Sequence, residues 1–385
     1  MTIYVLFLIV LCNVTCLRAS RVIVSLFAIE LGAQQFLIGV LIAMYSVFPM
    51  LLALYAGRLS DRLGPRLPML VGSLGLVAGL LLPFLYPALP ALYVSAGLFG
   101  MSYVFYHVSV QNLIGAISTD ATRTRNFSNY SLMIALGGFI GPSLAGIFID
   151  HFGHPRTYLY LSAVALIPVI TLAFAKTIGT GVTKPAGPAE HATSVEEARS
   201  LFANAGLRRA MITSGVVLTG TDLFQFYMPI YGHSIGLSAS AIGFVLSLVA
   251  VAAFVVRVIM PLVVKRVGEE PLLTHSLFLG AATYLFFPIV QNVALLSVLA
   301  FVLGLGLGCG QPLSTILTYA HSPKNRSGEA LGLRLTVNNA THIVVPLIFG
   351  SIGTVLGFAP VFWMNALLLA GGGMLNRAAP RRDAL

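Results

Sequence analysis

The chain has 385 residues, of which 57% are hydrophobic and only 9% are charged, and its mean hydropathy is +0.92. A soluble protein carries about 25% charged residues, so this composition excludes an ordinary soluble globule. The formal net charge of +10 does not indicate nucleic-acid binding, because the basic residues lie mostly in loops between long apolar segments. The sequence therefore predicts an all-α protein that crosses a membrane many times.

Twelve apolar segments, each near the length of about 20 residues that a membrane helix needs, follow one another along the chain. They cover residues 3–28, 36–56, 67–87, 90–117, 127–149, 156–175, 208–232, 238–264, 271–290, 293–320, 329–355 and 359–376. Short turns join most neighbours, whereas residues 176–207 are polar and rich in Gly, Pro and charge. We therefore expect four parts: an N-terminal six-helix bundle (1–176), a cytoplasmic linker with a short amphipathic helix (177–207), a C-terminal six-helix bundle (208–377) and a cytoplasmic tail (378–385).

Lysine and arginine fall on one side of these predicted spans. With a cytoplasmic N-terminus, 17 of the 22 basic residues lie in cytoplasmic loops, and only Arg156 lies in an opposite loop. Basic residues concentrate in the loops that remain on the cytoplasmic side, so this asymmetry predicts that both termini are cytoplasmic. The other four, Arg18, Arg21, Arg257 and Arg334, lie inside apolar segments.

The two halves of the chain repeat at an offset of 204 residues. The shift superimposes five Gly and Pro positions without a gap: Gly39 on Gly243, Gly64 on Gly268, Pro142 on Pro346, Gly146 on Gly350, and Gly153 on Gly357. Internal repeats of this kind are typical of transporters built from two similar bundles. We expect two six-helix bundles related by a pseudo-twofold axis along the membrane normal.

The loop "GRLSDRLGPR" (57–66) resembles the signature between the second and third helices of the major facilitator superfamily, Gly-x-Leu-x-Asp-Arg-x-Gly-Arg-Lys/Arg. Pro65 replaces the first of the two closing basic residues. The resemblance implies the major facilitator fold of twelve helices, with helices 1, 4, 7 and 10 lining a central cavity. The charge in the loop also predicts a cytoplasmic latch between the bundles, formed by Gly57, Asp61, Arg62, Gly64 and Arg66, because Asp61 can meet a basic residue or a helix N-terminus of the other bundle. Positive charge that merely sets the topology is the alternative, which suffices for Arg66 but gives no role to Asp61.

The fifth predicted helix contains "GGFIGPSLAG" (137–146), which is similar to a pattern frequent in proton-coupled antiporters of this superfamily. Its candidate packing residues are Gly137, Gly141, Pro142 and Gly146. Small residues allow helices to approach closely, so generic tight packing explains the pattern almost as well as an exporter function does. Ala96 stands where the fourth helix of those antiporters carries an arginine, which argues against the exporter interpretation.

Charges inside the spans are the candidate site residues, because a charge at the bilayer centre costs about 2.5–3.5 kcal/mol on insertion scales. Arg18 lies near the middle of the first span, and the 204-residue offset places it on Asp222 of the seventh. We expect these two side chains to face each other across the axis, either as a breakable pair or as a static ion pair. The same offset places Arg21 on Gln225 and His107 on Gln311.

The predicted substrate-binding set unites these residues with other polar side chains of the spans. It consists of Arg18, Arg21, His107, Gln111, Asp222, Gln225, Arg257, Gln311, Arg334 and Asn338. Asp222 and His107 are the candidates for proton coupling, although a lone membrane histidine is more often a packing residue. Arg257 and Arg334 lie within two turns of the predicted cytoplasmic helix ends, where they could reach the lipid–water interface instead.

An excess of buried arginine over buried acid favours an anionic or zwitterionic solute. We expect a secondary active transporter of a small organic anion or zwitterion that works by alternating access and is coupled to protons. A proton-driven drug or metabolite exporter is the alternative, and a non-transporting membrane receptor is a remote one. The chain shows no P-loop and no catalytic or metal-binding motif, so we expect no enzyme activity, no cofactor and no metal site. The expected setting is a bacterial inner membrane, with the protein as a monomer.

Overall fold

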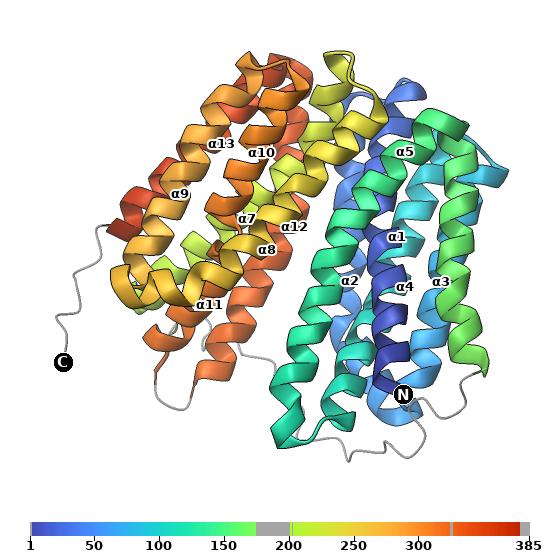
Figure 1. The fold of residues 1–385 in the computed structure, drawn as a ribbon, viewed down its shortest axis with the longest axis horizontal. Helices are drawn as coiled ribbons and strands as arrows, with labels where there is room; N and C mark the ends of the chain where they lie inside the picture. Colours follow the sequence, from blue (N-terminus) through green and yellow to red (C-terminus); the bar gives the residue numbers. More distant parts are fainter. Residues whose placement is uncertain (1, 175–200, 202, 324–325, 378–385) are drawn as a thin grey trace. The chain divides into compact units, whose positions relative to one another are not determined.

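The computed structural model describes residues 2–174, 201, 203–323 and 326–377, and every element in these ranges is a helix (Figure 1). In chain order the elements are α1 (Thr2–Glu30), α2 (Gln35–Leu63), α3 (Arg66–Leu85), α4 (Leu89–Ile117), α5 (Asp120–Phe174), α7 (Ala205–Ser234), α8 (Ala239–Val267), α9 (Glu269–Phe286), η1 (Phe287–Ile289), α10 (Val293–Leu307), α11 (Gly310–His321), α12 (Ser327–Leu356) and α13 (Phe358–Arg377).

The helices of the described ranges account for the twelve predicted spans. Among the described residues, ten segments are long and apolar enough to cross a membrane. The longest of them, within α5, is two helices joined at Gly153, whose backbone is not helical (φ 76°, ψ 171°). The less apolar α7 completes the set, because it carries Arg208, Arg209, Asp222 and several Ser and Thr residues.

One predicted span, 293–320, is divided into α10 and α11 by a two-residue break at Gly308 and Cys309. Pro312 explains the break, because it has no N–H to donate to the carbonyl of Gly308 four residues earlier. The freed carbonyl accepts a hydrogen bond from the Nε of Arg257 on α8 (3.0 Å). Arg257 therefore has a structural partner at the break.

Large apolar side chains cover much of the surface of these helices. Phe174 is 82% exposed, Val355 80% and Leu367 72%. Apolar surface on this scale is unstable in water and is typical of a protein that contacts another apolar phase. The surface therefore agrees with lipid-facing helices.

The chain divides into two compact units. The first consists of Met1–Glu190 and Met228–Ser247, and the second of His191–Tyr227 and Leu248–Leu385. The end of α7 and the start of α8 therefore pack with the first unit. Most of the predicted linker (177–207), namely residues 177–200 and 202, and the predicted tail (378–385) lie outside the described residues, so the amphipathic helix expected in the linker stays a prediction.

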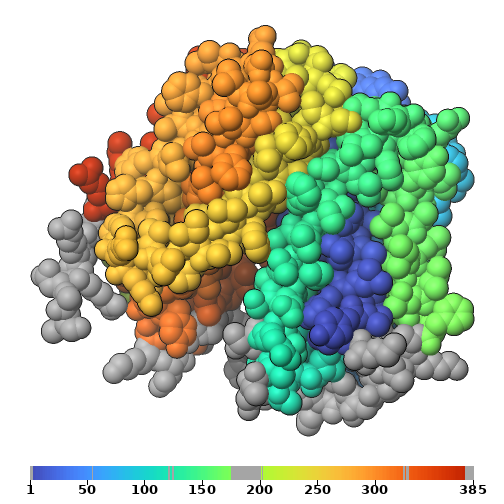
Figure 2. Space-filling model, in the orientation of Figure 1, coloured from blue at the N-terminus to red at the C-terminus, as the bar shows by residue number. Residues whose placement is uncertain are grey.

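In the first unit, α1 packs along α5 with little space between the two backbones. A Cβ added to Gly137 would lie 2.7 Å from the Val14 side chain, and one added to Gly141 would lie 2.6 Å from the Cβ of Arg18. The first turns of α1 reach the surface between the two halves of α5 (Figure 2). The absence of side chains at Gly137 and Gly141 thus allows α1, at Val14 and Arg18, to pack directly against α5.

The start of α8 packs on the other side of the same pattern, still within the first unit. A Cβ on Gly146 would lie 2.9 Å from the Cα of Ser240, and Ser143 bonds Ser247 at 2.8 Å. Asp150 accepts hydrogen bonds from the backbone N–H groups of Ala239 (3.0 Å) and Ser240 (2.8 Å). A carboxylate from α5 therefore caps the N-terminus of α8.

Removing this cap should destabilise the first unit. Asp150→Ala leaves the N–H groups of Ala239 and Ser240 without their acceptor, and we expect a loss of about 1–2 kcal/mol in the free energy of unfolding. The midpoint of thermal unfolding in detergent measures this loss. Asp150→Asn, which retains one carbonyl acceptor, should fall between the wild type and Asp150→Ala; equal midpoints for all three proteins would contradict the capping role.

The 204-residue repeat is also present in the backbone of the described residues. All six glycines with positive φ fall into three pairs at this offset: Gly32 and Gly236, Gly64 and Gly268, and Gly153 and Gly357. Glycine tolerates positive φ because it has no Cβ. The two halves therefore share the same chain reversals at the same helix ends.

Candidate functional site

A buried polar cluster lies in the second unit where α7, α11 and α12 meet. The Nη2 of Arg334 donates to Gln311 Oε1 (2.7 Å), to the Gln311 carbonyl (3.1 Å) and to Ser314 Oγ (3.1 Å). Asn338 donates to Gln311 Oε1 (3.2 Å) and accepts from Ser214 Oγ (3.0 Å). The structure thus brings three predicted site residues, Gln311, Arg334 and Asn338, into one hydrogen-bonded group.

The cluster is largely buried, with Gln311 partly exposed, and its arginine has no acidic partner among the described residues. Arg334 is 5% exposed and Asn338 7%, while Ser214 and Ser314 are fully buried. The Nε of Arg334 has no hydrogen-bond partner, and no carboxylate pairs with this side chain among the described residues. The hydrogen-bond partners of this guanidinium are therefore all neutral in the part of the chain that the structure describes.

An acid–imidazole pair lies on the same two helices, α7 and α12. His342 Nδ1 contacts Asp222 Oδ2 directly, and both side chains are partly buried (30% and 12% exposed). Arg334, Asn338 and His342 are spaced by four residues, so they lie along one face of α12. Asp222 and the Arg334 cluster therefore belong to one polar stripe between α7 and α12.

In the first unit, the predicted residues of α4 form a smaller and mostly aromatic group. Gln111 Nε2 lies 3.1 Å from His107 Nε2 and donates to the Tyr130 hydroxyl at 3.4 Å. The His107 ring stacks on Tyr103 with 5.2 Å between ring centroids. The described partners of His107 are therefore neutral, unlike those of His342.

The two arginines of α1 are held by different surroundings. The guanidinium of Arg21 lies over the Tyr45 ring, 5.7 Å from its centroid, in a cation–π contact. Arg18 stands where Gly141 leaves room against α5. Arg18 and Asp222 belong to different units, so the expectation that they face each other stays a prediction. The same holds for Arg21 and Gln225.

Comparison with known proteins assigns the family. The sequence model described as Major Facilitator Superfamily matches residues 6–292 and 210–384 of this chain. The chain belongs to the major facilitator superfamily. The predicted family and fold class are thereby confirmed, and the protein is a multi-pass integral membrane transporter.

Relatives within the superfamily cover almost the whole chain. Multidrug resistance protein 2 of Bacillus subtilis (strain 168) is 22% identical over 346 residues, 87% of this chain and 84% of that protein. Multidrug resistance protein MdtG of Klebsiella pneumoniae (strain 342) is 22% identical over 356 residues, 90% of this chain and 84% of that protein.

Solved structures agree in fold. A mutant of the peptide transporter POT matches with a TM-score of 0.82 at 15% identity, covering 98% of this chain and 93% of that one. A mutant of the nucleoside transporter NupG gives 0.78 at 14% identity and covers 98% of both chains. At such identities these likenesses establish the major facilitator fold and leave the solute open.

The signature loop of this superfamily member has clear partners inside the first unit. Asp61 accepts a hydrogen bond from the Asn112 side chain of α4 (2.9 Å). Arg66 donates to the carbonyls of Leu172 (2.8 Å) and Ala173 (3.1 Å) at the end of α5. Gly64 makes the turn between α2 and α3 with φ 76°. These contacts fix the helix ends around the loop, and the latch between bundles remains a prediction.

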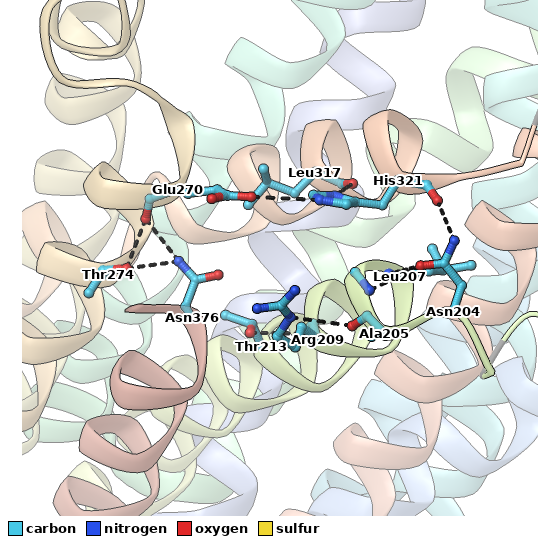
Figure 3. Close-up of polar contacts among 11 residues, drawn as sticks. Asn204, Ala205, Leu207, Arg209, Thr213, Glu270, Thr274, Leu317, His321 and Asn376 are labelled. Atoms are coloured by element: carbon cyan, nitrogen blue, oxygen red, sulfur yellow. Dashed lines mark hydrogen bonds and ion pairs between the residues drawn. The ribbon is translucent and has the colours of Figure 1, made fainter. Parts of the chain in front are cut away.

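A second polar cluster of the second unit joins the helix ends that we expect to face the cytoplasm (Figure 3). His321 Nε2 lies 3.6 Å from Glu270 Oε1, and Asn376 donates to the Glu270 carbonyl and to Thr274 Oγ1, both at 2.8 Å. Asn204 Oδ1 accepts from the Gly206 N–H at the start of α7 (3.0 Å). The cluster secures α7, α9, α11 and α13, and it contains none of the predicted binding residues.

Sequence reasoning did not identify Ser214 of α7 and Ser314 of α11, and it did not predict that His342 pairs with Asp222. The spacing of residues 334, 338 and 342 was the available signal for His342, because positions four apart share a helix face. Nothing distinguished the two serines, since serine is common at membrane helix contacts. No group of His, Cys, Asp and Glu in the described ranges could hold a metal ion.

Proposed function

We propose that this protein is a proton-coupled secondary active transporter that moves a small organic anion or zwitterion by alternating access. The charge balance at membrane depth carries the proposal: four arginines lie within the apolar segments, and the hydrogen bonds of Arg334 go only to neutral groups. Guanidinium groups bind carboxylates through paired, charge-assisted hydrogen bonds. Such an interior favours an anion and disfavours a lipophilic cation.

Asp222 is the proposed proton carrier, together with His342. A carboxylate and an imidazole in direct contact can take up a proton and release it with a change in the charge of the pair. Ionisable residues inside a membrane typically serve such relays. His107 was the other sequence candidate, and its neutral surroundings give it less support.

The drug or metabolite exporter is the second candidate. The names of the multidrug resistance relatives support it, as does the fifth-helix pattern. For either function we propose a monomer in a bacterial inner membrane, with both termini cytoplasmic, and transport without enzyme activity or a cofactor.

Uptake into proteoliposomes tests the proposal. A panel of carboxylates and zwitterions is compared with cationic dyes, with and without an inward proton gradient, for the wild type and for Arg18→Ala. We expect gradient-driven uptake of an anion or zwitterion, reduced at least about tenfold by Arg18→Ala, which corresponds to about 1.4 kcal/mol. Transport of cationic dyes alone, unaffected by the substitution, would replace the anion proposal with the exporter, and no flux of any solute would favour a receptor.

A further inference from the structure

The repeat makes an internal comparison possible at the polar cluster of α7, α11 and α12. The four positions Ser214, Ser314, Arg334 and Asn338 correspond, 204 residues earlier, to Val10, Val110, Tyr130 and Ile134. Val10, Val110 and Tyr130 belong to one hydrophobic core cluster of the first unit, and Ile134 packs against it. Gln311 corresponds to His107, which contacts Gln111, and Gln111 donates to the Tyr130 hydroxyl. The same fold therefore builds the equivalent helix junction from apolar side chains and a few polar groups, with a tyrosine in place of the arginine.

This comparison shows that the fold does not need a charge at the junction. Replacing buried ionic groups by well-packed apolar side chains is often neutral or stabilising. The second unit nevertheless contains a buried arginine with an unpartnered Nε, surrounded by two serines, an asparagine and Gln311. A requirement other than packing must account for these residues.

We propose that the Arg334 cluster binds the carboxylate, or an equivalent oxyanion, of the transported solute; this rests on the proposed transport of anions. The Nε–H of Arg334, which has no hydrogen-bond partner among the described residues, is a donor that the oxyanion can use. Gln311 and Ser314 hold the Nη2 side of the guanidinium, and Asn338 orients Gln311 from α12. Because the cluster is buried, the solute reaches it when α7, α11 and α12 separate during the transport cycle.

The Asp222–His342 pair is well placed to sense this binding, because His342 lies one turn beyond Asn338 on the same face of α12. An oxyanion at Arg334 neutralises the positive end of the stripe. Binding of the anion and protonation of the pair then act on the same two helices, α7 and α12.

The test uses the carboxylate that the wild type takes up fastest, in proteoliposomes of the full-length protein. Arg334→Gln should raise its KM at least about tenfold, because it removes a charge-assisted donor. Arg209→Gln is the matched control. It removes one positive charge from the same unit, where Arg209 donates to the Ala205 carbonyl (3.4 Å), and its KM should equal that of the wild type. An unchanged KM for Arg334→Gln would overturn the proposal.

Asn338→Asp decides the question if Arg334→Gln fails to fold. It retains Arg334 and adds a resident carboxylate that competes with the solute, so the variant should fold, unfold at a higher temperature than the wild type, and lose carboxylate uptake. Normal carboxylate uptake by this variant would overturn the proposal that the Arg334 cluster binds the solute. If the wild type transports only cationic dyes, both the proposed function and the proposed site are wrong. If the wild type takes up the anion and the variants do so equally well, the function stands and only the site is wrong.

Discussion

Replacing Asp222 with asparagine should uncouple transport from the proton gradient while leaving the carrier able to exchange solute. Asparagine has nearly the shape of aspartate and still accepts a hydrogen bond from His342, but it does not titrate. We expect concentrative, gradient-driven uptake to fall at least about tenfold, and counterflow between equal solute pools to stay near the wild-type rate. Uptake is measured in proteoliposomes with an imposed inward proton gradient and, separately, without one.

The control for this substitution is Glu329→Gln. It removes another carboxylate from the first turn of α12, where Glu329 pairs with Arg326 at the surface, and it should leave both assays unchanged. Gradient-driven accumulation by Asp222→Asn at the wild-type level would show that the proton is carried elsewhere. Loss of counterflow as well would instead assign Asp222 to binding or folding.

The fold was largely predictable because its signals are strong in the sequence. The apolar segments are long, and most of their ends lie within a few residues of the observed helix ends; the expected span 3–28, for example, is α1 at Thr2–Glu30. The exceptions are the end of α2 and the start of α5, where the helix continues into polar and charged residues that the hydropathy pattern had excluded. The repeat predicted that Gly153 and Gly357 are equivalent, and both have positive φ in the structure. The pair Gly32 and Gly236 obeys the same offset and was not recognised, because isolated glycine matches occur by chance in a chain with 38 glycines.

The site was predicted as a set of polar residues and not as an arrangement. Gln311, Arg334 and Asn338 were expected because they are polar within apolar segments, but their mutual contacts depend on how α11 and α12 pack, which periodicity does not determine. Arg257 was grouped with them for the same reason. Its hydrogen bond to the Gly308 carbonyl depends on the break caused by Pro312, and the sequence had offered only reach to the interface as the alternative.

The comparison between halves changes the meaning of the buried arginine. Hydropathy alone treats Arg334 as an unfavourable residue near a helix end, which could extend to the interface. The structure places its side chain in the interior, and the first unit shows Tyr130 at the equivalent position in a hydrophobic cluster. The two halves therefore fill equivalent helix junctions with different residues, a tyrosine in one and an arginine in the other. This difference is stronger evidence for a functional role of Arg334 than its burial alone.

The close contact between α5 and the start of α8 should tolerate no added atom at Gly146. A Cβ there would lie 2.8 Å from the carbonyl carbon of Ala239 and 2.9 Å from the Cα of Ser240, both of them backbone atoms that a rotamer change does not move. We expect Gly146→Ala to cost about 1–3 kcal/mol of unfolding free energy, the usual range for overpacking. Thermal unfolding in detergent measures the loss, and uptake should fall with it.

Gly115→Ala is the matched comparison in α4, because nothing lies within 4 Å of the Cβ that it adds. Alanine is favoured over glycine in a helix by about 0.5–1 kcal/mol, so this variant should be slightly more stable than the wild type. The same Gly→Ala substitution is thus expected to lower the free energy of unfolding at position 146 and to raise it at position 115. A stabilised Gly146→Ala would mean that α5 and α8 separate freely at this level, and that the glycine of the fifth-helix pattern has no packing role there.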